Sequence, residues 1–285
     1  MSKKLQYALI FNIAWISLIF FSKKALNSGA EPIPFVIENS IITLVLLTFY
    51  VYFSKRSSLR KIKIRDFRVF TGIGAFVAIA WLSETYGLRL STAINYSFII
   101  ETAFVFAVVL AFFFVGEVIH FKKILIMTAI MAGAYLVSTG GALIIPKPGD
   151  LLIVLAAFCY SLSNIMQKPV LKRVDPVIVG WMRFLFALLL LLVFITIFNT
   201  KNLVLVTPVY VLLAGIASAF TTVYISKTIS VSSVSYQTMM SMLTPVVNIY
   251  LGMTFLKEAI NIYQILGGFL IIGSIILAQD KRFGM

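Results

Sequence analysis

The segment 185–198 reads LFALLLLLVFITIF, and Thr196 is its only polar residue. A membrane strand alternates apolar and polar side chains over about ten residues, so this continuous run predicts a membrane-spanning helix. A hydrocarbon core about 30 Å thick requires roughly 20 apolar residues per helix, and the apolar stretch extends back to residue 176. The environment of this segment is therefore lipid.

The rest of the chain repeats this kind of segment. Hydrophobic residues make up 61% of the sequence and charged residues 12%, which excludes an ordinary soluble domain. Ten apolar stretches are separated by short polar breaks: 5–22, 33–53, 69–88, 92–115, 121–142, 150–167, 176–198, 207–226, 233–256 and 261–279. We expect an all-α polytopic membrane protein with ten transmembrane helices and no sizeable soluble domain. The first stretch has a full-length counterpart at 150–167, so we interpret it as a retained helix rather than a signal peptide.

Metal and redox chemistry have little support. Cys159 and His120 are the only residues of their kinds, which excludes an intramolecular disulfide and a His/Cys metal cluster. We expect no cofactor and no metal.

The basic residues predict the orientation. If the N-terminus is cytoplasmic, seventeen of the 24 lysines and arginines fall on the inner side, six fall on the outer side and Arg183 lies within a span. This asymmetry follows the positive-inside rule and explains the net charge of +14 without nucleic acid. We expect both termini in the cytoplasm and an integral protein of a prokaryotic plasma membrane. Contact of the run 55–68 with anionic lipid is an alternative function for part of this charge.

The chain contains an internal repeat, with the first copy at 1–144 and the second at 145–285. A shift of 145 residues places Trp15 on Tyr160, a shift of 144 pairs Pro32 with Pro176, and a shift of 141 aligns later anchors. Those anchors are Gly74 with Gly215, Ser91 with Ser232, and Glu117 with Glu258. Five spans per copy put the second copy into the membrane upside down. Such inverted repeats are a recurring architecture of secondary transporters.

With these anchors, the chain resembles the drug/metabolite transporter superfamily, specifically its EamA-type members with ten helices. The resemblance covers nearly the whole chain and is carried by Pro176 with Arg183 seven residues later, the run Leu243-Thr244-Pro245-Val246, and the glutamates of Val115-Gly116-Glu117 and Leu256-Lys257-Glu258. It implies a carrier for small metabolites, amino acids or drug-like solutes. Two positions depart from the pattern: Phe104 occupies the counterpart of Pro245, and Asn39, beside Glu38, occupies that of Arg183.

Four ionisable residues lie inside the predicted spans: Glu38, Glu84, Glu101 and Arg183. Each costs a few kcal/mol to insert, and such residues usually face a bundle interior or a cavity. Glu101 lies near the membrane midplane opposite Met242 of the second copy, so the fold does not require its charge. It either contacts the substrate or a proton, or it is a buried neutral carboxyl.

Other marked residues fit gating or structural roles. For Arg183 the alternatives are an ion pair or cytoplasmic gate, which we favour, and a contact with a substrate carboxylate. Glu38 and Glu84 would be charges near the outer ends of their helices, and Asn39 marks the altered position. Pro245 predicts a bend beside a cavity or a static kink. Glu117 and Glu258 predict helix capping or gate contacts.

Polar and aromatic side chains at helical spacing predict a central pocket. The candidates that contact substrate are Asn12, Trp15, Trp81, Asn95, Tyr96, Glu101, Tyr160, Asn164, Gln237 and Ser241. A stripe of such residues is also typical of interhelical contacts. With three acids and one base inside the spans, the pocket would accept a cation or zwitterion more readily than a highly charged anion.

These patterns predict a secondary transporter that moves small organic metabolites (amino acids, amines or drug-like solutes) by alternating access, as an exporter or a facilitator. Its partners would be the small-molecule substrate and membrane lipid. Protons are one alternative as a coupling ion, and uncoupled transport is the other. A polytopic membrane enzyme lacks a catalytic constellation here, and a channel lacks a filter-like loop; both remain alternative functions.

Overall fold

The computed structural model describes residues 3–115, 121–142, 146–197, 209–232, 234–241 and 243–278, and these residues form helices and short connections without a strand. The first half contains α1 (Lys3–Asn27), α2 (Pro32–Ser54), the short 3-10 helix η1 (Arg56–Lys61), α3 (Ile64–Leu90), α4 (Ala93–Ile99), the 3-10 turn η2 (Ile100–Thr102), α5 (Ala103–Val115) and α6 (Phe121–Thr139). The second half contains α7 (Pro148–Leu171), α8 (Pro176–Ile197), α9 (Val209–Val231), α10 (Val234–Met240), α11 (Leu243–Phe255) and α12 (Ile262–Ala278).

The helices confirm the all-α membrane class. Within the described residues, seven helical segments are long and apolar enough to cross a membrane: α1, α2, α3, the continuous segment Ala93–Phe114, α7, α8 and α9. Apolar parts of α6 and α12 are shorter, at Ile124–Thr139 and Ile262–Ser274. Large side chains such as Phe53 (75% exposed) and Phe269 (73%) lie on the outside. In water such a surface would be unfavourable, whereas in a bilayer it faces lipid.

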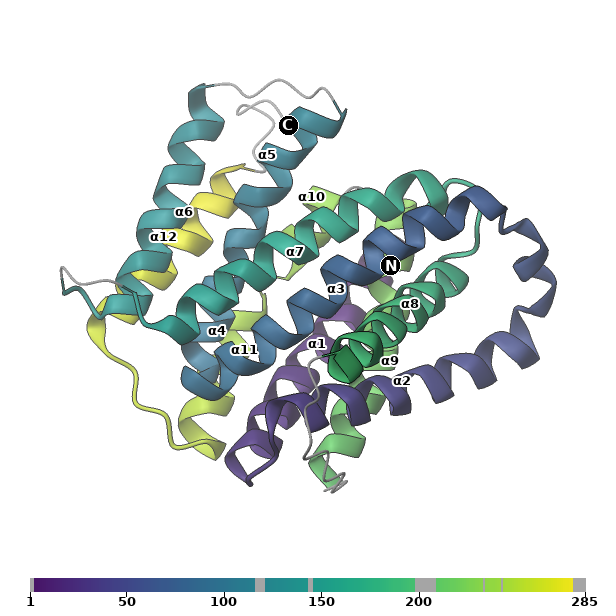
Figure 1. Ribbon diagram of the computed structural model, residues 1–285. Helices are drawn as coiled ribbons and strands as arrows, with labels where there is room; N and C mark the ends of the chain where they lie inside the picture. The colour runs from purple at the N-terminus through teal and green to yellow at the C-terminus, as the bar shows by residue number, and fades with distance from the viewer. Residues whose placement is uncertain are drawn as a thin grey trace.

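Helices of the first half pack mainly against helices of the second half (Figure 1). Helix α3 lies along α7, α1 lies along α9, and α6 lies along α12. The repeat relates α1 to α7 and α3 to α9, so the first two contacts are equivalent. Close approaches follow the same rule: Gly74 of α3 faces Phe186 of α8, and its counterpart Gly215 of α9 faces Ile42 of α2. Each glycine lets two helices approach where a larger side chain would collide.

Two helices are interrupted at equivalent places. The 3-10 turn η2 separates α4 from α5, and α10 ends at Met240 before α11 begins at Leu243. Both first pieces have seven residues and both second pieces have thirteen. Pro245 lies in the first turn of α11, where a missing backbone N–H leaves no intrahelical bond unmade. The first half is interrupted although Phe104 occupies the proline position. The proline is therefore not the only cause of the break.

The connections gather on two faces of the helix bundle. We call the side where α1 begins the N-terminal face; there Lys55 forms an ion pair with Asp175 at 2.8 Å, and Arg173 pairs with Asp66. Both pairs join the two halves. On the opposite face, Lys23 donates hydrogen bonds to the carbonyls of Leu88 and Ser91 at 2.7 and 2.5 Å.

Candidate functional site

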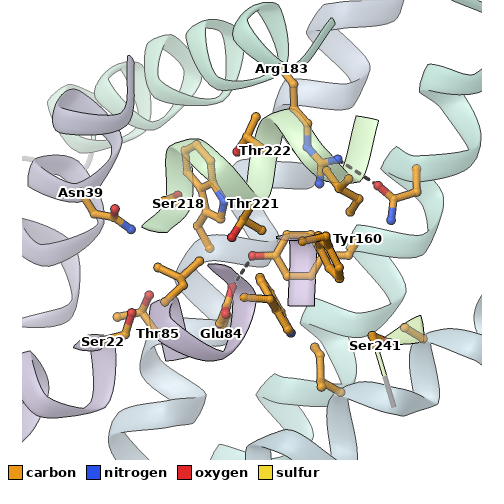
Figure 2. Close-up of a pocket in the computed structure, with 18 of the residues that line it drawn as sticks. Ser22, Asn39, Glu84, Thr85, Tyr160, Arg183, Ser218, Thr221, Thr222 and Ser241 are labelled. Atoms are coloured by element: carbon orange, nitrogen blue, oxygen red, sulfur yellow. Dashed lines mark hydrogen bonds between the residues drawn. The ribbon is translucent and has the colours of Figure 1, made fainter. Parts of the chain in front are cut away.

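A cavity of about 110 Å³ lies between the two halves. One ordered water requires roughly 10–15 Å³ by the same measure, so the cavity has room for a small solute. Figure 2 shows Arg183 and Glu84 on different helices with Tyr160 between them. The polar and aromatic lining comprises Phe11, Trp15, Ser22, Phe35, Asn39, Ser40, Trp81, Glu84, Thr85, Glu101, Tyr160, Ser161, Asn164, Arg183, Phe184, Ser218, Thr221, Thr222, Gln237 and Ser241.

Arg183 supplies the positive charge of the cavity. Its side chain is 5% exposed, and Nη1 donates a hydrogen bond to Oδ1 of Asn164 at 2.9 Å. The guanidinium carbon lies 5.9 Å from the centroid of the Tyr160 ring, within the range of a cation–π contact. None of the ion pairs in the described part of the chain involves Arg183. Of the two roles favoured from the sequence, the ion pair is not among those of the described residues, and the cytoplasmic gate stays a prediction; the guanidinium faces the cavity.

Glu84 is held by two tyrosines. The hydroxyl of Tyr96 donates to Oε1 at 2.6 Å, and the hydroxyl of Tyr160 donates to Oε2. Glu84 lies near the outer end of α3, where the sequence predicted it, and it lines the cavity. Two hydroxyl donors satisfy both oxygens of this partly buried carboxylate.

Glu101 lies in the η2 interruption and is 1% exposed. Its Oε2 accepts a hydrogen bond from Oγ of Ser241 at 3.0 Å. Ser241 lies in the interruption between α10 and α11, so this bond joins the equivalent breaks of the two halves. Both side chains line the cavity.

The structure separates the other candidates into two groups. Trp15, Trp81, Asn164 and Gln237 line the cavity with those already named. Three others do not line it and instead bond neighbouring helices or backbone. Asn12 donates to Ala8 O at 2.7 Å, Asn95 accepts from Gln264 at 2.5 Å, and Tyr96 bonds Glu84. These three residues therefore hold helices around the cavity and do not line it.

The candidate gating residues have different environments. Glu258 accepts hydrogen bonds from the backbone N–H groups of Ala93 and Ile94 at 2.8 and 3.1 Å, and so caps α4. Glu38 is buried at 6% exposure outside the cavity lining. Asn39 lines the cavity, and its Oδ1 is buried without a hydrogen-bond partner among the described residues. Glu117 and the Met242 counterpart of Glu101 lie outside the described residues.

Sequence reasoning missed the contribution of α9. Ser218, Thr221 and Thr222 line the cavity from this helix, and Figure 2 shows them beside Arg183 and Tyr160. Their spacing of three and four residues places them on one helical face. That spacing could have identified them. However, serine and threonine are common in membrane helices, so the spacing alone is a weak indication of a cavity.

Membrane helices from two matching halves that enclose a polar cavity define the class of helical membrane transporters. The EamA-like transporter family model matches the chain twice, over residues 2–139 and 147–279. The chain belongs to this family, and thereby to the drug/metabolite transporter superfamily. A search of curated proteins finds no match. A solved crystal structure is similar at a TM-score of 0.67 and 15% sequence identity, covering 98% of this chain and 99% of the other, which supports the fold alone.

Proposed function

We propose that this chain is a secondary transporter that moves a small zwitterionic metabolite, such as an amino acid, across a prokaryotic plasma membrane by alternating access. The observation that carries the proposal is the buried guanidinium of Arg183, which lines the cavity without a carboxylate partner in the described part of the chain. A guanidinium binds carboxylates through two parallel hydrogen bonds. A substrate carboxylate would therefore provide the anionic partner that Arg183 lacks among the described residues.

The rest of the cavity suits the other end of such a substrate. Glu101 offers a carboxyl group, and the rings of Trp15, Trp81 and Tyr160 offer aromatic faces that attract an ammonium group. A dicarboxylate or phosphate would meet Glu84 and Glu101 in the same space. A zwitterion agrees with these charges better than a highly charged anion, and a simple amine would leave Arg183 unpaired.

The proposed topology has ten spans in two inverted repeats of five. In it, α4 and α5 form one interrupted span and α10 and α11 form its counterpart, while the shorter α6 and α12 form the closing spans. The N-terminal face is cytoplasmic, because it carries the basic connections Lys55–Lys63 and Lys172–Arg173. Rocking of the halves about the cavity then exposes the site to each side in turn, as an exporter or a facilitator.

Flux assays test this function. Purified protein is first screened by thermal shift against neutral amino acids, amines and nucleosides, and the hits are measured as radiolabelled uptake into proteoliposomes. We expect saturable uptake of amino acids and competition by unlabelled substrate. Uptake that rises linearly with concentration would indicate a channel, and protein-dependent chemical conversion of the solute would indicate an enzyme.

A further inference from the structure

The cavity departs from the symmetry of the repeat. Toward the opposite face it reaches Ser22, Val36, Thr85 and Leu88. Their counterparts toward the N-terminal face are Gln167, Gly180, Ser226 and Ile229, by shifts of 145, 144, 141 and 141 residues. All four counterparts are described residues, and none lines the cavity. Toward the N-terminal face these equivalent positions are packed and do not line the cavity, and we call this end the closed end.

Packing at the closed end is tight. Gln167 and Ser226 are 0% exposed and Ile229 is 2% exposed. A Cβ atom added to Gly180 of α8 would lie 3.0 Å from Cγ2 and 3.1 Å from the carbonyl oxygen of Thr222 in α9. On the other side, the larger Val36 occupies the glycine position and faces the cavity. The glycine thus allows α8 and α9 to meet at the N-terminal end.

A chain of hydrogen bonds runs from the cavity into this closed end. Arg183 Nη1 donates to Asn164 Oδ1 at 2.9 Å, and Gln167 Nε2 donates to the same oxygen at 3.0 Å. Ser226 Oγ then donates to Gln167 Oε1 at 3.3 Å. The chain joins α8, α7 and α9, and each of its members is at most 7% exposed.

The equivalent positions of the first half cannot form this chain. Asn164 corresponds to Ile19, which has no polar atom in its side chain, and Gln167 corresponds to the short Ser22. Arg183 corresponds to Asn39, whose Oδ1 lacks a hydrogen-bond partner among the described residues. This chain of hydrogen bonds is thus specific to the N-terminal end.

We infer that Arg183, Asn164, Gln167 and Ser226 form a latch that holds the N-terminal end of the cavity closed, and that opening this end requires the latch to break. The inference rests on the proposed function in one respect: a substrate carboxylate on Arg183 acts on the same hydrogen-bond chain that closes the cavity. Asn164 and Gln167 are positioning residues, because they connect the cavity cation to the closure.

Cysteine labelling in the absence of substrate tests the latch. Cys159 is the only cysteine, so Cys159→Ser provides a background for two reporters at equivalent positions, Leu88→Cys and Ile229→Cys. Labelling by a membrane-impermeant maleimide is followed in nanodiscs, where both faces are accessible. Leu88 is 1% exposed and Ile229 is 2% exposed, so we expect both reporters to react slowly when the latch is intact.

Breaking the latch should raise labelling at Ile229→Cys and not at Leu88→Cys. Ser226→Ala removes one hydrogen bond and should raise the labelling rate of Ile229→Cys about twofold to tenfold. Gln167→Leu and Arg183→Gln should raise it at least as much. Matched controls are Ser138→Ala and Gln264→Leu, which remove buried hydrogen bonds to Asp150 and Asn95 elsewhere. These controls should leave the rate at Ile229→Cys unchanged.

The latch is overturned if Ser226→Ala and Gln167→Leu label Ile229→Cys no faster than their matched controls do. Size-exclusion profiles identify any variant that fails to fold, and Ser226→Ala, the smallest change, then decides alone. Because no substrate is present, this result is independent of the flux assay. Absent amino-acid flux with positive labelling would reject the proposed substrate and retain the latch.

Discussion

The two halves of the molecule agree in their backbone and differ in their charges. Equivalent breaks divide α4 from α5 and α10 from α11, and equivalent glycines bring α3 to α8 and α9 to α2. Yet Glu101 has Met242 as its counterpart, and Arg183 has Asn39. The shared residues are those that the packing of helices requires. Glu101, Arg183 and Asn39 line the cavity, and we propose that they determine what it binds.

The largest effect should follow from removing the unshared cation. Arg183→Gln takes away the proposed partner of a substrate carboxylate, and loss of one member of a buried charge pair costs about 2–5 kcal/mol. We expect amino-acid affinity to fall at least about 30-fold, measured by thermal shift and by half-saturation of uptake. Arg89→Gln is the control, because Arg89 pairs with Glu31 at 2.6 Å outside the cavity. Unchanged affinity in Arg183→Gln would contradict the substrate assignment.

The next effect concerns the unshared acid. If Glu101 binds a driving proton, Glu101→Gln should abolish uptake driven by a pH gradient and preserve exchange of substrate across the membrane. The amide keeps the size of the side chain and its acceptor for Ser241, which bonds the carboxylate at 3.0 Å. The measurement compares both fluxes in the same proteoliposomes. Unchanged gradient-driven uptake would show that the coupling proton, if there is one, binds elsewhere.

The sequence predicted the shared features better than the unshared ones. The run 185–198 indicates a membrane helix by composition alone, and the offset between Gly74 and Gly215 relates the halves. The pairing of Glu84 with Tyr96 and Tyr160 depends on how α3, α4 and α7 are rotated against each other. Helical spacing does not determine such rotations. It marked Tyr160 and Asn164 of α7, which line the cavity, together with Asn12, Asn95 and Tyr96, which do not line it.

The interruption in the first half was also beyond sequence reasoning. Pro245 marks its equivalent in the second half, but the residues Ile100–Thr102 of η2 contain neither proline nor glycine. Here tertiary contacts override local preference. Glu101 and Ser241 meet across the two breaks, and such a contact cannot be identified from either segment alone.

A smaller effect, on thermal stability, is expected at the two equivalent glycines. A Cβ atom on Gly74 would lie 2.8 Å from the backbone carbon of Phe186 and 2.9 Å from the backbone nitrogen of Ala187, so a helix would have to move. A Cβ atom on Gly215 would meet mainly the Ile42 side chain, at 2.6 and 2.8 Å. Overpacking costs about 1–3 kcal/mol. We expect Gly74→Ala to lower the thermal unfolding midpoint more than Gly215→Ala.

Gly273 provides the control for this comparison. It lies within α12, and an added Cβ atom would meet nothing within 4 Å. Alanine is favoured over glycine in a helix by about 0.8–1 kcal/mol, so Gly273→Ala should leave the midpoint unchanged or raise it. Equal midpoints for all three variants would mean that the close approaches of α3 and α9 are not tight.

The smallest effect, on stability, is expected at two equivalent acids. Glu31 and Asp175 each precede the first proline of a helix. Asp175 bonds Lys55 across the halves, and this hydrogen bond raises the pKa of Lys55 above 10.5. Glu31 bonds Arg89 within the first half, and this bond lowers the pKa of Glu31 below 4.5. The Lys55 contribution is therefore complete below pH 10.5 and is lost as the pH rises through the raised pKa. The Glu31 contribution is complete above pH 4.5 and is lost as the pH falls through the lowered pKa.

Because the Lys55 pair joins the two halves and the Glu31 pair does not, removal of the Lys55 pair should affect the molecule more. We expect Lys55→Gln to cost about 0.2–1 kcal/mol of stability, as is typical of partly exposed ion pairs, and Glu31→Gln to cost less. Thermal unfolding at neutral pH, repeated at high salt, measures both, since salt screens such pairs. The same Lys55→Gln variant should slightly raise labelling at Ile229→Cys, because the pair lies on the closed N-terminal face. A larger loss for Glu31→Gln would show that contacts within one half outweigh those between the halves.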